Sequence, residues 1–378
     1  MIDSAQSWQV PRGRAAAACL APCVIILLCI SAACAQSVAF INPGTSDELY
    51  WLTATQSMQA AAHSLGITFE VQYAEREPMK TFAIAREMVA RPVRERPDCI
   101  VITDDSAVAD QLLKIIDAAG VKSFLAYSSI PNEQRVGVGS PRGKYKGWLG
   151  SLEPRAEVAG YLTAHALIER GKKEKVFGRD GKLHMLAIPG DRSTSTSIKR
   201  NAGMHRAVAE DASVVLDQET YAAWAREIAA TRADQLYRLY PDAKLVWAGN
   251  DLMAFGAMAA WENRGGKPGV DAWFSGINTS MEALEAIKTG RLTSLAGGHF
   301  IAGAWALVMI YDYHHGRDFA DEGLELQQLM FAEFTPQLAD RYLQLFKNGF
   351  NGIDFSRYSK VKNPQLKRYN FGFVQLLD

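Results

Sequence analysis

The stretch KLVWAGNDLMAFGAM, from Lys244 to Met258, decides the fold of this 378-residue chain. Its residues Leu245 to Ala248 are apolar, as in a strand that is buried on both faces of a sheet. Asn250 and Asp251 follow at the point where a helix begins. Asn and Asp are good helix caps, and in open α/β sheets the same strand end is where ligands bind. We expect Asn250 to face a cleft and Asp251 to cap the following helix.

The same alternation of strand and helix runs through most of the chain. Apolar strands such as Ser37–Ile41 and Cys99–Thr103 alternate with segments of helical period such as Tyr50–Leu65. The stretch Ser128–Trp148 is rich in Gly, Pro and Ser and is typical of a long loop or linker. The alternation then begins again. This pattern predicts an α/β fold with parallel sheets, covered on both faces and divided between two similar lobes.

The amino terminus has the features of a secretory signal peptide. Two arginines precede the apolar run Ala15–Ile30, which is shorter than the roughly 20 residues that span a bilayer. Ala33-Cys34-Ala35 fits an A-x-A cleavage site, so we expect cleavage near Ala35 to remove residues 1–35 and leave an exported protein. The alternatives are an uncleaved anchor and a lipoprotein acylated on Cys34. Ser31 stands where a lipobox usually has Leu, which disfavours the lipoprotein.

The composition excludes several classes of protein. Lys+Arg and Asp+Glu are both 41, so no basic excess indicates binding to nucleic acid or to an anionic membrane. The contents of 48% hydrophobic and 22% charged residues are those of a globular protein. Four of the five cysteines lie in the leader, and Cys99 alone cannot form an internal disulfide. We interpret Cys99 as a small buried apolar residue.

Sequence signatures of catalysis are missing from the chain. It contains no G-x-S-x-G, no H-E-x-x-H, no P-loop and no dinucleotide fingerprint after the first strand. His314 and His315 are adjacent near a predicted helix end, so they point in different directions. They are better explained as partners of the helix dipole than as metal ligands. We therefore expect a protein that is not an enzyme and that uses neither a metal nor a cofactor.

Polar and aromatic side chains instead gather at the predicted strand ends. Each has an ordinary explanation: Asn278 could cap a helix, Arg200 could form a surface ion pair, and Trp51 could lie in the core. Because the carboxyl ends of parallel strands share one edge of a sheet, we expect these side chains to bind a small polar ligand together. Polar groups would bond its hydroxyls, and Trp51 and Trp224 would cover the two faces of a sugar ring. The candidate ligand-binding residues are Asp47, Glu48, Tyr50, Trp51, Tyr127, Ser128, Asp191, Arg200, Trp224, Asn250 and Asn278.

Three stretches resemble the type I periplasmic binding proteins of the ribose/galactose kind, a group that includes quorum-signal receptors. They are PDAKLVWAGNDLMAFGAMAA (241–260), GDRSTSTSIKRNAGMHRAV (190–208) and SGINTSMEALEAIKTGRLTSLAG (275–297). The resemblance runs from about Ser37 to His315. It implies two Rossmann-like lobes joined by a three-segment hinge that closes on ligand. The implied lobes are 37–150 with about 298–320, and 151–297 with about 321–378 as a wrapping tail.

The resemblance also implies roles for particular residues. It assigns ligand binding to Arg200, Asn250 and Trp224 in the second lobe, and to the aromatic pair Tyr50 and Trp51 in the first. The sequence departs from the family pattern at other positions, since Asn278 and Tyr127 each stand where sugar binders usually have Asp. Arg200 therefore lacks its usual carboxylate neighbour unless Asp191 or Asp47 takes that place, and the ligand need not be ribose or galactose.

These observations lead to one expected function and one alternative. We expect a monomeric periplasmic solute-binding protein that captures a sugar or sugar-like ligand and delivers it to the membrane permease of an ABC importer. The alternative is a periplasmic sensor that binds a small molecule and signals to a membrane histidine kinase or cyclase. The altered sugar-binding positions and the additional tail motivate this alternative.

Overall fold

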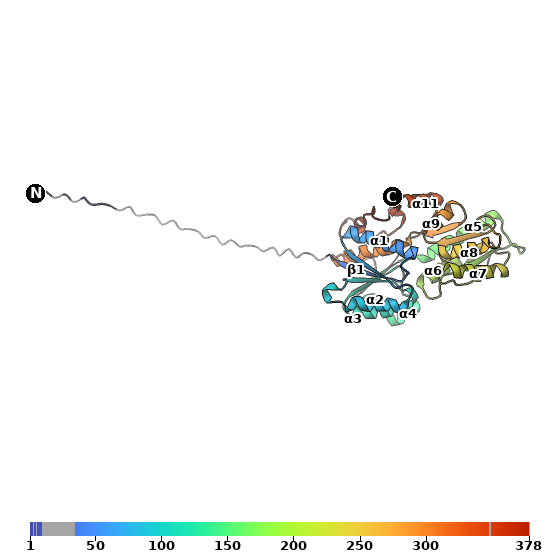
Figure 1. The fold of residues 1–378 in the computed structure, drawn as a ribbon, viewed down its shortest axis with the longest axis horizontal. Helices are drawn as coiled ribbons and strands as arrows, with labels where there is room; N and C mark the ends of the chain where they lie inside the picture. Colours follow the sequence, from blue (N-terminus) through green and yellow to red (C-terminus); the bar gives the residue numbers. More distant parts are fainter. Residues whose placement is uncertain (3, 5, 10–34, 348, 378) are drawn as a thin grey trace. The chain divides into compact units, whose positions relative to one another are not determined.

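The computed structural model describes residues 1, 2, 4, 6–9, 35–347 and 349–377 (Figure 1). Residues from Ala35 onward form one compact unit, and the fold described below is that of this unit. The apolar run Ala15–Ile30 and Cys34, on which the signal-peptide and lipoprotein predictions depend, lie outside the described residues. Within the described part of the chain, no helix combines the length and the apolar character needed to cross a membrane.

The strands of the described residues form two six-stranded sheets. The first sheet has the order β11-β5-β4-β3-β1-β2, and its strands pair in parallel. These strands are β1 (Ser37–Asn42), β2 (Thr68–Tyr73), β3 (Cys99–Ile102), β4 (Lys122–Ala126), β5 (Trp148–Pro154) and β11 (Glu325–Gln328). Every residue of β3, Cys99 included, is buried, as expected for a strand covered on both faces. We call this sheet and its helices the first lobe.

The second sheet has the order β12-β10-β9-β8-β6-β7, in which β12 alone among the described strands runs antiparallel to its neighbour. Its strands are β6 (Leu183–Ile188), β7 (Val214–Glu219), β8 (Leu245–Ala248), β9 (Trp273–Ile277), β10 (Ser294–Gly297) and β12 (Ala332–Glu333). The predicted strand Leu245–Ala248 is β8, fully buried between β6 and β9. This sheet and its helices are the second lobe, and the predicted two-lobe α/β fold is confirmed.

Helices cover both faces of the first sheet. Figure 1 shows α1 on one side of β1 and α2 and α3 on the other, and the two sides bury separate apolar clusters. The helices of this lobe are α1 (Leu49–Leu65), α2 (Pro78–Ala90), α3 (Ala109–Ala118), α4 (Asn132–Val138) and α10 (Ala302–His314). Short 3-10 turns occur at η1 (Val93–Glu95), η2 (Asp105–Ala107) and η3 (His299–Ile301).

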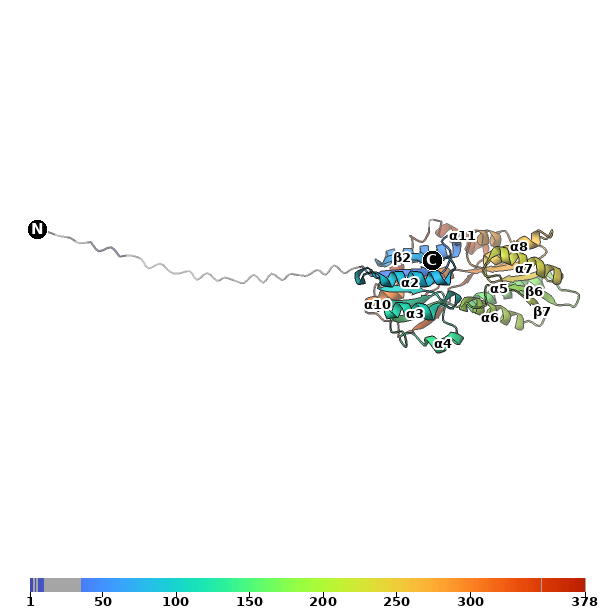
Figure 2. The ribbon, with the colours of Figure 1, turned by 60° about the horizontal axis from the view of Figure 1, so that its bottom comes forward.

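The second lobe is layered in the same way. Figure 2 shows α7 and α8 on one side and α5 and α6 on the other, in agreement with their two apolar clusters. Its helices are α5 (Ala156–Glu174), α6 (Ser195–Ala209), α7 (Arg226–Leu239), α8 (Asp251–Glu262) and α9 (Met281–Lys288). Gly160 of α5 lets α6 approach closely, because a Cβ there would lie 1.9 Å from the carbonyl oxygen of Arg200. This contact fixes the helix that carries Arg200.

The segment Ser128–Trp148 is more structured than a linker. It contains α4 and leads directly into β5. The sequence did not indicate β5 because Gly150, Ser151 and Glu153 interrupt its apolar pattern. Glu153 is nevertheless buried, since it forms an ion pair with Lys199 at 2.6 Å and accepts a hydrogen bond from Gln327 at 2.7 Å. A buried carboxylate is tolerated when it is paired in this way.

The tail after α10 contributes to both sheets, whereas we expected residues 321–378 with the second lobe. β11 pairs with β5 of the first sheet, and β12 pairs with β10 of the second. α11 (Pro336–Leu345) then packs against α9. η5 (Val374–Leu377) packs against α11, whereas η4 (Phe355–Tyr358) returns to the first lobe, against α1 and α10. There the Tyr369 hydroxyl donates to buried Asp312 of α10 at 2.8 Å.

Candidate ligand-binding cleft

A cavity of about 690 Å³, counting the solvent at its mouth, lies between the two lobes. Its walls come from the carboxyl ends of strands in both sheets and from the segments that cross between the lobes. The structure brings together most of the candidate residues at this cavity, namely Glu48, Tyr50, Trp51, Tyr127, Ser128, Arg200, Trp224, Asn250 and Asn278. Sequence reasoning missed other lining residues, among them Arg76, Thr103, Asp104, Asp105, His299 and Phe331.

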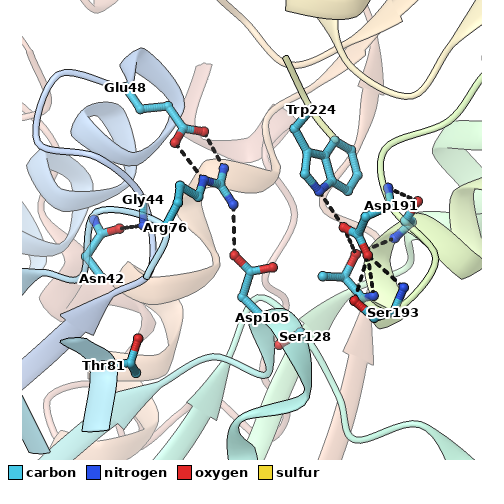
Figure 3. Close-up of polar contacts among 12 residues, drawn as sticks. Asn42, Gly44, Glu48, Arg76, Thr81, Asp105, Ser128, Asp191, Ser193 and Trp224 are labelled. Carbon is cyan, nitrogen blue, oxygen red and sulfur yellow. Dashed lines mark hydrogen bonds and ion pairs between the residues drawn. The ribbon is translucent and has the colours of Figure 1, made fainter. Parts of the chain in front are cut away.

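Asp47 and Asp191 do not line this cavity. Asp47 is exposed, and its carboxylate accepts a hydrogen bond from Thr45 Oγ1 at 2.7 Å. Asp191 lies beside Trp224, whose indole Nε1 donates to it at 2.6 Å (Figure 3). Burial raises the pKa of Asp191, but the N–H and hydroxyl groups of Ser193 and Thr194, just before α6, outweigh burial and lower its pKa below the ordinary value. Asp191 therefore orients Trp224 and the loop before α6.

Asn250 and Asp251 have structural roles that differ in part from those we expected. Asn250 is the cap of α8, because its Oδ1 accepts the backbone N–H of Met253 at 2.8 Å, and it also lines the cavity. Asp251 is the first residue of α8, and its Oδ1 also accepts a first-turn backbone N–H of this helix, that of Leu252 at 2.9 Å. Its buried carboxylate accepts the side-chain amide of Asn278 at 2.9 Å and the backbone N–H of Ser280 at 3.3 Å. Asp251 thus holds the end of β9 beside the end of β8.

An ion-pair network forms the first-lobe wall of the cavity. Arg76 Nη2 lies 2.6 Å from Glu48 Oε1, and Arg76 Nη1 lies 2.8 Å from Asp105 Oδ2 (Figure 3). Burial lowers the pKa of Arg76, but the two carboxylates outweigh this and raise it above the ordinary value. Burial raises the pKa of Asp105. Arg76 follows β2 and Asp105 follows β3, so their strand-end positions were a usable signal that we did not apply.

Aromatic rings form a continuous layer along the cavity. Trp51 meets Tyr127 edge-on, with ring centroids 5.2 Å apart. Tyr50 stacks on His299 at 4.9 Å, and His299 stacks on Phe331 at 4.4 Å. Trp51 is only 6% exposed, whereas Trp224 is half-buried. A ligand therefore has freer access to Trp224, and the sandwich of a sugar ring between the two indoles stays a prediction.

Arg200 and His299 meet at the centre of the cleft. Arg200 is 3% exposed; its Nη1 donates to the carbonyl of Gly249 at 2.7 Å, and its Nη2 donates to Nε2 of His299 at 2.9 Å. Burial lowers the pKa of Arg200 to about 10, so it remains charged at neutral pH. Burial, followed by the nearby Arg200, lowers the pKa of His299 well below its ordinary value. His299 is therefore a neutral imidazole.

Three lining residues have backbone conformations that non-glycine residues rarely adopt. The φ angles are 70° at Tyr127, 64° at Trp224 and 117° at Asn278. Such conformations cost about 1–3 kcal/mol each and tend to cluster at functional sites. Trp224 lies in the loop just before α7, which begins at Arg226 after this left-handed turn.

The chain matches a known family over most of its length. Residues 38–318 match the periplasmic binding protein domain. The chain belongs to this family. The crystal structure of a periplasmic sugar-binding protein from Pseudomonas fluorescens is 38% identical, with a TM-score of 0.81 over 90% of this chain and 99% of that one. The predicted family, fold and class of function, periplasmic solute binding, are confirmed.

Two curated relatives have more specific names. They are the D-apiose import binding proteins of Actinobacillus succinogenes and Paraburkholderia graminis, each 24% identical to this chain. The alignments cover 68% and 67% of this chain, and 76% and 74% of the relatives. Membership of a periplasmic family gives this protein a periplasmic location. The cleavage site near Ala35 stays a prediction.

Proposed function

We propose that this protein captures a sugar or sugar-like solute between its two lobes and delivers it to an ABC importer. One observation carries the proposal: a cavity lined by polar and aromatic side chains at the carboxyl ends of both sheets. Ligands of open α/β sheets bind at this edge, and rings with polar neighbours suit a molecule that has both hydroxyl groups and C–H faces. The names of the curated relatives support a carbohydrate carried by an importer.

The cleft closes by a hinge in the proposed mechanism. The chain crosses between the sheets after β5, after β10 and between β11 and β12. Rotation about these three segments would bring the first lobe toward the second lobe, and with β5 in the first sheet the first lobe boundary would fall after Pro154. The tail joins both lobes through β11 and β12, so it would belong to the hinge region and not to one lobe. Small-angle scattering with and without ligand measures this closure.

The proposed role involves binding without chemistry by a monomer. A bound solute should therefore be recovered unchanged, and light scattering should give the mass of one chain. A sensory protein would use the same closure to engage a histidine kinase or cyclase. Co-purification with a permease and ATPase supports import, whereas co-purification with a sensor kinase supports the alternative.

Arg200 supplies the direct test of the binding site. Mass spectrometry of what co-purifies with the mature protein identifies the solute, and thermal shift measures its binding. Arg200→Ala should abolish the ligand-induced rise in Tm while circular dichroism shows an intact fold. Unchanged affinity in a folded Arg200→Ala protein would show that the cavity described above is not the binding site.

A further inference from the structure

Arg200 is a buried cation without a carboxylate partner. Its hydrogen bonds go to a carbonyl and to a neutral imidazole, and its Nε has no partner among the described residues. No described carboxylate forms an ion pair with it. Asp251 acts on Arg200 only through space, because its oxygens already accept from Asn278 and Ser280. A buried charge left in this state is unfavourable, so it requires a counter-charge from elsewhere.

His299 adds a second unused donor beside Arg200. Its Nε2 accepts from Arg200, so the single proton of the neutral ring lies on Nδ1. Nδ1 is buried and has no partner among the described residues. The rings of Tyr50 and Phe331 on its two sides hold the imidazole in place. Arg200 and His299 therefore both offer N–H groups that require an acceptor.

The opposite wall has the reverse polarity. Glu48 and Asp105 share Arg76, so three charged groups there carry two negative charges and one positive. Asp104 lies beside them, 1% exposed; its Oδ1 accepts the N–H of Ala109 at 3.0 Å and its Oδ2 has no partner among the described residues. Hydroxyl donors suit this wall. An occupant of this cavity should thus present hydroxyl groups to the first lobe and an acceptor to Arg200.

We propose that the ligand is a sugar acid whose carboxylate pairs with Arg200 and whose hydroxyl groups face the carboxylates of the first lobe. The proposal rests on the function proposed above. The Nε–H of a guanidinium and one Nη2–H lie side by side and bind both oxygens of a carboxylate. A neutral sugar satisfies the hydrogen bonds of Arg200 but leaves its charge unpaired. A carboxylate satisfies both requirements.

Matched pairs of sugars test this proposal on the wild-type protein. The probes are galacturonate with galactose, glucuronate with glucose, gluconate with glucitol, and arabinonate with arabinitol, measured by thermal shift and then by calorimetry. At least one acid should bind about 10- to 100-fold more tightly than its neutral partner, the effect expected of a charge-assisted contact. Neutral sugars that bind as tightly as their acids would overturn the sugar-acid proposal and leave the binding function standing. If none of the probes bound, the result would count against both the sugar-acid proposal and the binding function.

Two variants then test whether Arg200 causes the preference for the acid over the neutral sugar. Arg200→Gln keeps a hydrogen-bonding side chain without the charge, and it should bring the acid and its neutral partner to within about threefold of each other. Arg226→Gln removes the same charge from the same lobe outside the cavity, where Arg226 pairs with Glu282, and it should keep the acid preference. A folded Arg200→Gln protein that still prefers the acid would contradict the proposal. If that variant does not fold, the wild-type comparison of acids with neutral sugars decides alone.

Discussion

Lys199 joins the two lobes without lining the cavity, which makes it a suitable probe of closure. It lies on α6 of the second lobe, and its Nζ donates to Ser129 Oγ at 2.9 Å and pairs with Glu153 Oε1 at 2.6 Å, both in the first lobe. Ser129 Oγ also lies 3.2 Å from Ser195 Oγ across the cleft. Because these contacts join the two lobes, we infer that this structure is the closed arrangement. Lys199→Met keeps the length of the side chain and removes all of its polar contacts.

The size of the effect follows from these contacts. Hydrogen bonds to charged groups contribute about 1.5–3 kcal/mol each, and Glu153 keeps its bond from Gln327, so we take about 2 kcal/mol for the loss in the closed state. Lys199 is absent from the cavity wall, so the ligand loses no direct contact. If the open state lacks these bonds, the apparent Kd should rise about 30-fold through the smaller closed population.

Calorimetry with the tightest-binding probe of the sugar pairs measures this Kd. The control is Lys173→Met, which replaces an exposed lysine of α5 in the same lobe and should leave the Kd within about twofold. Scattering of the ligand-free proteins should show Lys199→Met at least as open as the wild type. A Kd unchanged by Lys199→Met, together with a lowered Tm, would refute the reasoning, because the contacts would then persist in the open state.

Three further outcomes follow from the structure. Burial raises the pKa of Asp104 from its ordinary 3.8 to about 6, so the folded state holds this proton more tightly than the unfolded state, and stability falls as pH rises through that window. Relative to Asp104→Asn, the wild type should therefore lose about 1–3 kcal/mol of unfolding free energy between pH 4 and pH 7 in urea titrations, and a pH-independent difference would exclude this. Gly298→Ala should lower stability by about 3 kcal/mol or more, because φ is 102° and the new Cβ would lie 2.3 Å from Phe373. Gly316→Ala, with φ at 83° and open space around it, should cost only about 1–2 kcal/mol, and equal Tm losses would contradict the contact with Phe373. Trp224→Phe should remove most of the ligand-induced change in tryptophan fluorescence, since Trp224 is a half-buried ring of the cavity wall; an undiminished signal would exclude that ring from the site.

The core strands could be predicted from the sequence because a strand that is buried on both faces consists of consecutive apolar residues. Leu245–Ala248 is such a strand, and Asn250 after it lines the cavity. β5 was not predicted, because a buried strand that carries Glu153 requires partners from distant segments, here Lys199 and Gln327. Local pattern carries no information about such partners. The same limit applies to Asp251, whose bond to the N–H of Leu252 in α8 is local, whereas its bond to Asn278 depends on the neighbouring strand.

Two of the cavity residues that the sequence did not reveal, His299 and Phe331, lie where the chain crosses between the lobes. His299 follows β10 and Phe331 lies between β11 and β12, so both belong to crossing segments and have no strand-end signature of the usual kind. Arg200 of the second lobe bonds to His299, and Tyr50 of the first lobe stacks on it. One side chain of a crossing segment thus contacts both lobes and the cavity. A ligand that engages Arg200 and His299 would fix their relative position, and closure and recognition would then depend on the same contact.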